Sequence, residues 1–252
     1  MKQRNKYDIA VEELASRFRN IPNFNLTQED EVGRKLFLFI IKRLSELNSL
    51  KTLFLQIYIP KTNEFIASEN REISKSQYKK LLSLSKIELN ENYYEIIRLG
   101  YVGMFHKYES FIQELISQAE DFVNNSIDPP TSLLVFCKEK FHYDPRDWKK
   151  SQFIEKINWI CNCIKHKDGF PIKSPKPLVF ENLNENERLK FTKDNFKSDL
   201  EILLTHYNIM LQMILSIGIY MIFLSRDYED LSFINASQEI KGTIEKMILE
   251  LQ

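Results

Sequence analysis

Two long segments of helical periodicity, residues 93–124 and 196–225, constrain the fold of this 252-residue chain most strongly. Each carries large apolar side chains at spacings of three and four, which places them on one face of a helix. The second segment is the most apolar of the predicted helices and is expected at the centre of the core. The pattern therefore predicts an all-α fold, an antiparallel helical bundle.

Shorter helices are predicted between polar or proline-containing breaks. They cover residues 7–18, 27–47, 76–84, 132–140, 146–167 and 236–251. Residues 50–58 fit either a helix or a buried strand, and Pro60 is predicted to end that segment. Residues 61–75 are polar and are predicted to form a surface loop.

One departure from helix is predicted near residues 178–192. Two short apolar segments, 178–180 and 189–192, flank the polar stretch 182–187, a pattern typical of a small β-hairpin. The polar stretch 61–75 marks a soft boundary. It divides the chain into an N-terminal helical extension, residues 1–75, and a helical bundle domain, residues 76–252.

Gly100 and Gly103 lie in the middle of the first long helix. A glycine there costs roughly 1 kcal/mol relative to alanine. Close approach of another helix is the usual reason for tolerating that cost, so a helix crossing is predicted at these two positions.

The overall charge gives no pull toward nucleic acid or membrane, because 35 basic residues balance 35 acidic ones. Residues 138–176 differ, with ten Lys or Arg against five Asp or Glu. Three cysteines and no apolar N-terminal signal favour a reducing, cytoplasmic location. Polar residues interrupt the apolar run 207–224, so it is expected to be a buried or dimer-interface helix, and no membrane partner is expected.

Residues 157–169 (INWICNCIKHKDG) are predicted to hold the function. Basic residues followed by Gly169 and Pro171 are typical of a helix C-terminus. Asn162 and His166 are four residues apart and therefore share one helix face, with Cys161 and Lys165 beside them.

Asn162, three intervening residues and His166 resemble the signature of the HEPN superfamily, in which an arginine and a polar residue precede a histidine on a helix. Cys161 stands at the position of that arginine. The aromatic-rich segment Tyr101–Ile116, Trp148 upstream and the expected hairpin downstream extend the resemblance over residues 91–224.

The resemblance implies an all-helical homodimer that needs no cofactor or metal. Active members of the superfamily are metal-independent endoribonucleases, and inactive members bind RNA or a partner protein. It suggests a role in a toxin–antitoxin, stress or antiviral defence system, with an antitoxin as one kind of partner.

Residue roles follow from the same resemblance. His166 would transfer the proton, with Asn162 as its polar partner, and a neutral-range imidazole pKa suits that task. Lys165 and Lys167, with Lys149 and Lys150, would contact RNA. Cys161, which cannot present a fixed guanidinium to a phosphate, would be a supporting residue. The same would hold for His106 and Glu109, which are three residues apart and form either a structural pair or part of the site.

Several alternatives remain open. His166 could be a helix-capping residue in a non-catalytic protein that dimerises or interacts through its helices. Cys161, Cys163 and His166 could hold zinc with Cys137 and His142, although two cysteines at this spacing point about 200° apart on a helix. A cysteine nucleophile beside His166 lacks an orienting third group.

Overall fold

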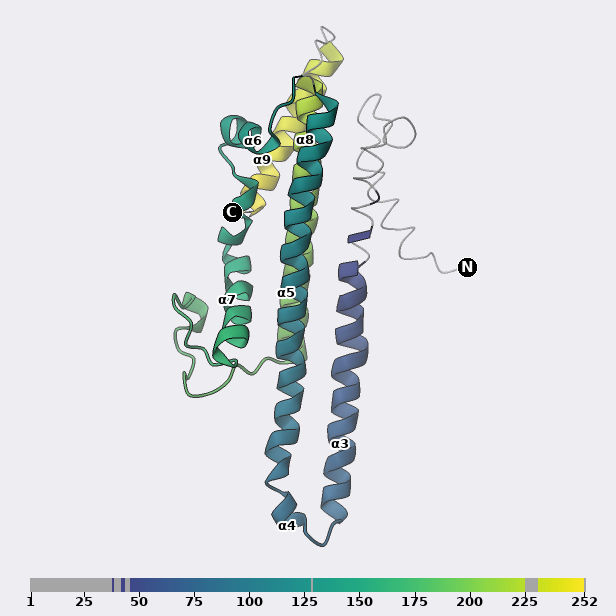
Figure 1. Ribbon diagram of the computed structural model, residues 1–252, viewed down its shortest axis with the longest axis vertical. Coiled ribbons are helices and arrows are strands. Elements are labelled where there is room, and N and C mark those ends of the chain that lie inside the picture. The colour runs from purple at the N-terminus through teal and green to yellow at the C-terminus, as the bar shows by residue number, and fades with distance from the viewer. Residues whose placement is uncertain (1–37, 39–41, 44–45, 128, 225–230, 252) are drawn as a thin grey trace, which may run out of the picture. The chain divides into compact units, whose positions relative to one another are not determined.

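The computed structural model describes residues 38, 42–43, 46–127, 129–224 and 231–251 (Figure 1). The helices predicted at 7–18 and 27–47 lie wholly or mostly outside these residues. The described residues are predominantly helical and include no strand, so the all-α prediction is confirmed.

The connections between the helices are short except for residues 168–192, between α7 and α8. The order is a π-helical turn η1 (Phe54–Tyr58), α3 (Ile59–Lys75), α4 (Lys79–Leu82), α5 (Ser85–Ser126), α6 (Leu133–Phe141), a 3-10 helix η2 (Pro145–Lys150), α7 (Gln152–Lys167), a 3-10 turn η3 (Leu178–Phe180), α8 (Lys193–Leu224) and α9 (Leu231–Leu251).

The chain forms two compact units. Among the described residues, unit 1 contains 38, 42–43, 46, 110–127, 129–148, 206–224 and 231–251, and unit 2 contains 47–109 and 149–205. The long helices α5 and α8 each contribute to both. Residues 47–75 belong to the same unit as residues 76–109, and the boundary expected near residue 75 stays a prediction.

The surface loop predicted for residues 61–75 is wrong, because these residues form α3. Pro60 does not end the preceding segment but occupies the first turn of α3. The backbone widens into a π-helical turn just before it, where the N–H of Ile59 bonds to the carbonyl of Phe54. A proline at the start of a helix loses no required hydrogen bond, so the helical path continues.

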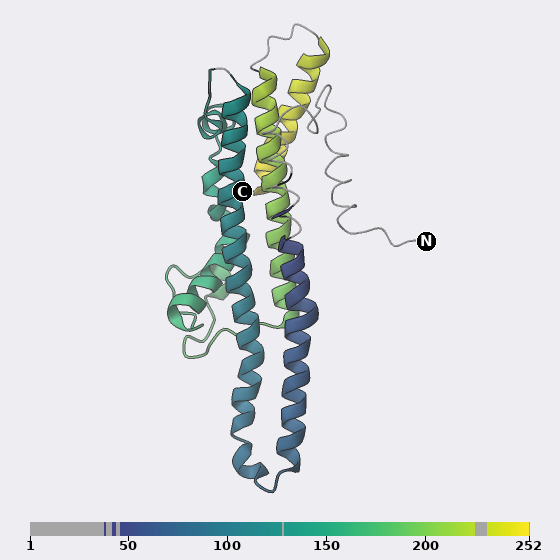
Figure 2. The same ribbon diagram turned by 45° about the vertical axis from the view of Figure 1, so that its right-hand side comes forward.

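Within unit 2, α3 and the first part of α5 lie side by side in both views and are joined by α4 (Figures 1 and 2). The helix α7 runs against α5 in the opposite direction, since Lys149 pairs with Glu109 near its start and Gly169 meets Arg98 beyond its end.

The helices α5 and α8 run in the same direction. The amide of Lys193 bonds to the Tyr93 hydroxyl, and Asp199 bonds to Tyr101 one or two turns further along both helices. A fully antiparallel bundle is therefore wrong at this pair. The cause is the direction of α7, which brings the chain back toward the end at which α8 begins.

A buried polar cluster joins three helices of unit 2. The Tyr101 hydroxyl on α5 donates to Asp199 on α8 at 2.7 Å, and Lys156 on α7 donates to the other carboxylate oxygen at 2.6 Å. The Asp199 side chain is only 5% exposed. Burial, followed by the nearby charge of Asp199, raises the pKa of Tyr101, so the phenol keeps its proton and remains a donor.

The predicted β-hairpin at about 178–192 is also wrong. Leu178–Phe180 form a 3-10 turn, and only Phe180 of the three is buried. The Phe180 ring stacks on Trp159 of α7 with centroids 4.9 Å apart, while the Trp159 indole donates to the Lys173 carbonyl. Individual anchors to α7 and α5, rather than a strand ladder, hold this segment.

Unit 1 packs the second part of α5 against α8 and α6. Gly218 of α8 lies against Phe122 and Val123, and Tyr220 contacts the rings of Phe136 and Phe141. One described helical segment, Lys193–Gly218, is long and apolar enough to cross a membrane by length and composition. Of its most apolar part 61% is buried inside the fold, and core helices of soluble proteins pass the same test.

The predicted helix crossing holds at one of the two glycines. A Cβ atom at Gly100 would lie 2.5 Å from the Phe196 ring of α8. A Cβ atom at Gly103 would meet nothing within 4 Å. Close approach therefore explains Gly100 and not Gly103.

Candidate nucleic-acid interface at the end of α7

The helix α7 ends where the sequence predicts, at Lys167. Asp168 and Gly169 both adopt positive φ values, 52° and 80°, which turn the backbone out of the helix. The Gly169 amide bonds to the Cys163 carbonyl at 3.0 Å, and the Phe170 amide bonds to the Lys167 carbonyl at 2.9 Å. These bonds satisfy helix-end carbonyls that otherwise lack partners.

A glycine is required at position 169 for two reasons. Its φ of 80° is strained for other residues, and a Cβ atom there would lie 3.1 Å from Cδ of Arg98. The end of α7 therefore sits directly on the aliphatic part of a buried arginine from α5.

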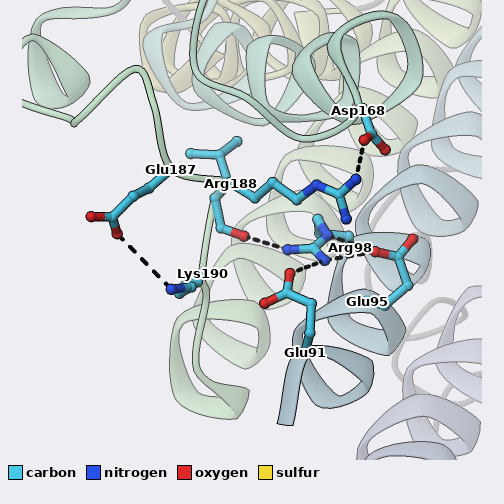
Figure 3. A network of polar contacts seen from close by, with 8 residues as sticks. Glu91, Glu95, Arg98, Asp168, Glu187, Arg188 and Lys190 are labelled. Atoms are coloured by element: carbon cyan, nitrogen blue, oxygen red, sulfur yellow. Dashed lines mark hydrogen bonds and ion pairs between the residues drawn. The ribbon is translucent and has the colours of Figure 1, made fainter. Parts of the chain in front are cut away.

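Arg98 organises this region (Figure 3). It is 1% exposed, and its guanidinium donates to the Leu189 carbonyl at 2.9 Å, to Glu91 at 2.6 Å and to Glu95 at 2.6 Å. The Leu189 amide in turn donates to the Gly169 carbonyl at 2.8 Å. The turn after α7 and the segment around Leu189 are thus fixed to one side of α5.

A second arginine holds the turn from its exposed side. Arg188 forms an ion pair with Asp168, and its guanidinium carbon lies 5.7 Å from the centre of the Phe170 ring. Figure 3 shows Arg188 reaching Asp168 from the segment around Leu189, whereas Arg98 lies on α5.

Lys165, His166 and Lys167 form the last turn of α7, and we call these three residues the basic turn. All three side chains are exposed. None of them forms an ion pair or a side-chain hydrogen bond with any residue for which the structure gives a position. The basic turn therefore presents two lysine ammonium groups and one imidazole to solvent, and Arg98 and Arg188 hold the backbone that follows it.

Asn162 and Cys161, which lie one helical turn before the basic turn, are less accessible than its side chains. Asn162 is half-buried, and its amide donates to the Asn158 side chain at 3.2 Å. Cys161 is 2% exposed, and its thiol donates to the Tyr101 carbonyl at 3.4 Å. Burial raises the pKa of Cys161, which keeps the thiol protonated.

The other residues expected at the site are only partly brought together. Lys149 forms an ion pair with Glu109, and the charges of Lys165 and Glu109 both act on the Cys161 thiol. Lys150 and His106 are exposed. The structure thus places Lys149, Glu109 and Cys161 in one neighbourhood, but the pair expected between His106 and Glu109 is replaced by the ion pair with Lys149.

The positive charge of this part of the chain is smaller than its sequence indicates. Residues 149–176 include seven lysines against two acidic residues. Carboxylates from elsewhere in the unit neutralise three of the lysines. The pairs are Lys149 with Glu109, Lys156 with Asp199, and Lys176 with Glu185. Of the other four lysines, Lys165 and Lys167 lie in the basic turn, and Lys150 and Lys173 lie outside it.

Sequence reasoning missed Arg98, Arg188 and the Tyr101–Asp199–Lys156 cluster. The sequence does offer one indication of Arg98, because this residue lies next to Ile97 and three residues before Tyr101 on the apolar face of α5. A charged residue on a buried helix face must be paired, so such a position predicts a buried ion-pair network. Arg188, in a polar stretch, gave no comparable signal.

Among the residues that the structure describes, no group of three or more His, Cys, Asp or Glu side chains is placed to hold a metal ion. Cys161, Cys163 and Cys137 are all buried, whereas His166 and His142 are exposed.

No family model matches this chain, and comparison with curated proteins and with solved structures finds no significant match either.

Proposed function

We propose that this protein is an HEPN-like RNA-directed protein that binds RNA through the basic turn without cleaving it. The burial of Cys161 is the observation that favours RNA binding over RNA cleavage. The residue that stands where the superfamily has arginine is neutral and enclosed by α5, so it presents no charge to a phosphate.

The exposed cations support the binding role. Lys165, His166 and Lys167 extend from a rigid turn, and lysine ammonium groups contact phosphates as mobile point charges. With so few cations, binding is expected to be weak and sequence-independent, with Kd of about 10⁻⁴ to 10⁻⁶ M at physiological salt.

Metal-independent cleavage is the second candidate, and one observation favours it. Arg188 pairs with Asp168, which follows His166 by two residues, so a guanidinium from another segment of the chain is bound to the same turn. In that case His166 would transfer the proton and Arg188 would stabilise the phosphate charge.

One experiment separates the two candidates. Purified protein is incubated with labelled single-stranded RNA in excess EDTA, beside His166→Ala and Arg188→Gln, and both intact RNA and bound RNA are measured. Binding without cleavage by all three proteins is the expected result. Cleavage by the wild type that both variants abolish would replace the binding proposal with the ribonuclease.

The resemblance also leads us to propose a homodimer formed through helices. Light scattering over a range of protein concentrations tests it. A monomer at every concentration would reject the dimer without affecting the RNA-binding proposal.

A further inference from the structure

We propose that the connection between α3 and α5 docks on the surface of an anionic lipid bilayer. We call this connection the hairpin tip and define it by Lys75, Tyr78, Lys79, Lys80, Leu81 and Leu84. The proposal is independent of RNA binding and of the basic turn.

The first observation is the exposure of large apolar side chains at the hairpin tip. Leu81 is 71% exposed, Leu84 is 70% exposed and Tyr78 is 62% exposed. The helix between α3 and α5 is only four residues long, so these side chains project from a tight turn instead of covering a core. Exposed apolar patches rimmed by polar residues mark protein or membrane interaction sites.

The second observation is charge. Residues 73–87 (ISKSQYKKLLSLSKI) contain four lysines and no acidic residue, in a chain whose overall charge is zero. Lys75 is paired with Glu72 at 2.9 Å, whereas Lys79 and Lys80 are exposed and form no ion pair with the described residues. A partner of the hairpin tip must therefore accept apolar side chains and carry negative charge.

An anionic bilayer meets both requirements better than a protein surface. Stable protein interfaces bury about 1,200 Å² or more in total, with matching shapes. The three apolar side chains lie within residues 78–84 and offer too small an area for that. A bilayer needs no matching shape, accepts leucine and tyrosine at its interface, and attracts adjacent lysines.

The expected geometry is shallow. Leucine and tyrosine side chains enter the headgroup region, while lysine ammonium groups stay at the surface with their aliphatic stems lying along it. Binding should therefore require anionic lipid, weaken with salt, and leave the helices of unit 2 folded.

The first test is co-sedimentation with vesicles of phosphatidylcholine alone or mixed with phosphatidylserine. Wild-type protein is expected to bind only the mixed vesicles. Lys79→Gln with Lys80→Gln should weaken binding about 30-fold, at about 1 kcal/mol per lysine. Leu81→Ser with Leu84→Ser should weaken it about tenfold or more. Circular dichroism establishes that each variant is folded.

A matched control exists in the same unit. Leu178 and Val179 are 82% and 71% exposed, but they lie outside the hairpin tip. Leu178→Ser with Val179→Ser should leave vesicle binding unchanged. Equal loss in this control would show nonspecific apolar adsorption and would overturn the proposal.

A second readout reports insertion directly. All three native cysteines are buried, so an environment-sensitive probe attaches selectively to Gln77→Cys at the tip or to Val179→Cys as the control. A blue shift with mixed vesicles only at residue 77 is expected. The absence of both the blue shift and co-sedimentation would overturn the proposal. Self-association that depends on the hairpin tip and needs no lipid would also overturn it, and would indicate that a second copy of this chain binds the tip.

Discussion

The thiol of Cys161 donates a hydrogen bond to the Tyr101 carbonyl, 3.4 Å away, in the buried contact between α7 and α5. Tyr101 also donates to Asp199, which accepts from Lys156. Cys161, which the proposed HEPN resemblance aligns with an arginine, is thus part of the packing that joins three helices.

Placing an arginine at this position should therefore damage the fold. Cys161→Arg would bury a guanidinium in a site that is 2% exposed. We expect it to lower the free energy of unfolding by about 3 kcal/mol or more, and to create no RNA cleavage. Urea denaturation measures the loss, with Lys165→Arg as the exposed control. A folded, cleaving Cys161→Arg protein with wild-type stability would contradict this account.

The two glycines in the middle of α5 provide a matched pair. Gly103→Ala should raise the free energy of unfolding by about 1 kcal/mol, since alanine is the better helix former and its Cβ meets no neighbour. Gly100→Ala should lower it by about 1–3 kcal/mol, because the added atom overlaps the Phe196 ring. Similar changes in thermal denaturation for both variants would disprove the close approach of α5 and α8 at Gly100.

Arg98 should hold the turn after α7 in place. Arg98→Met removes its bonds to Leu189, Glu91 and Glu95, and we expect a loss of about 3 kcal/mol. Hydrogen exchange at the Leu189 amide should accelerate more than exchange in α6. The exposed Arg71 offers the control, and Arg71→Met should change neither quantity.

The stability of unit 1 should fall in weak acid. Burial lowers the pKa of His206 to about 4, below its ordinary value of 6.5. As the pH falls, the unfolded chain therefore takes up this proton before the folded chain does. The free energy of unfolding is undiminished by His206 above pH 6.5 and decreases as the pH falls toward 4. At pH 5 the loss is about 2 kcal/mol.

His206→Leu should remove most of the difference in unfolding free energy between pH 7 and pH 5. The exposed His106 is the control, and His106→Gln should retain that difference. An unchanged pH dependence in His206→Leu would assign the effect to other groups.

The sequence predicted those features that depend on local rules. The end of α7 follows from basic residues and a glycine, and the structure has it at Lys167. The long helices follow from apolar periodicity, although α5 begins eight residues before the predicted start at 93.

The predictions that were wrong concern segments whose structure depends on contacts beyond the local sequence. Phe180 stacks on Trp159, and Leu189 bonds to Arg98, so the segment 178–192 is held by side chains of α7 and α5 that no local pattern reveals. Pro60 was read as a stop because its place in a first helical turn depends on the π-helical turn before it.

The salt dependence of RNA affinity tests the central claim most directly. Fluorescence anisotropy in EDTA is measured over a salt series for the wild type, for Lys165→Gln with Lys167→Gln, and for the control Lys79→Gln with Lys80→Gln. The basic turn predicts that the first variant reduces the slope of log affinity against log salt by about 1.4, while the control does not. Unchanged slopes in both variants, or RNA cleaved by the wild type, would contradict binding by the basic turn without cleavage.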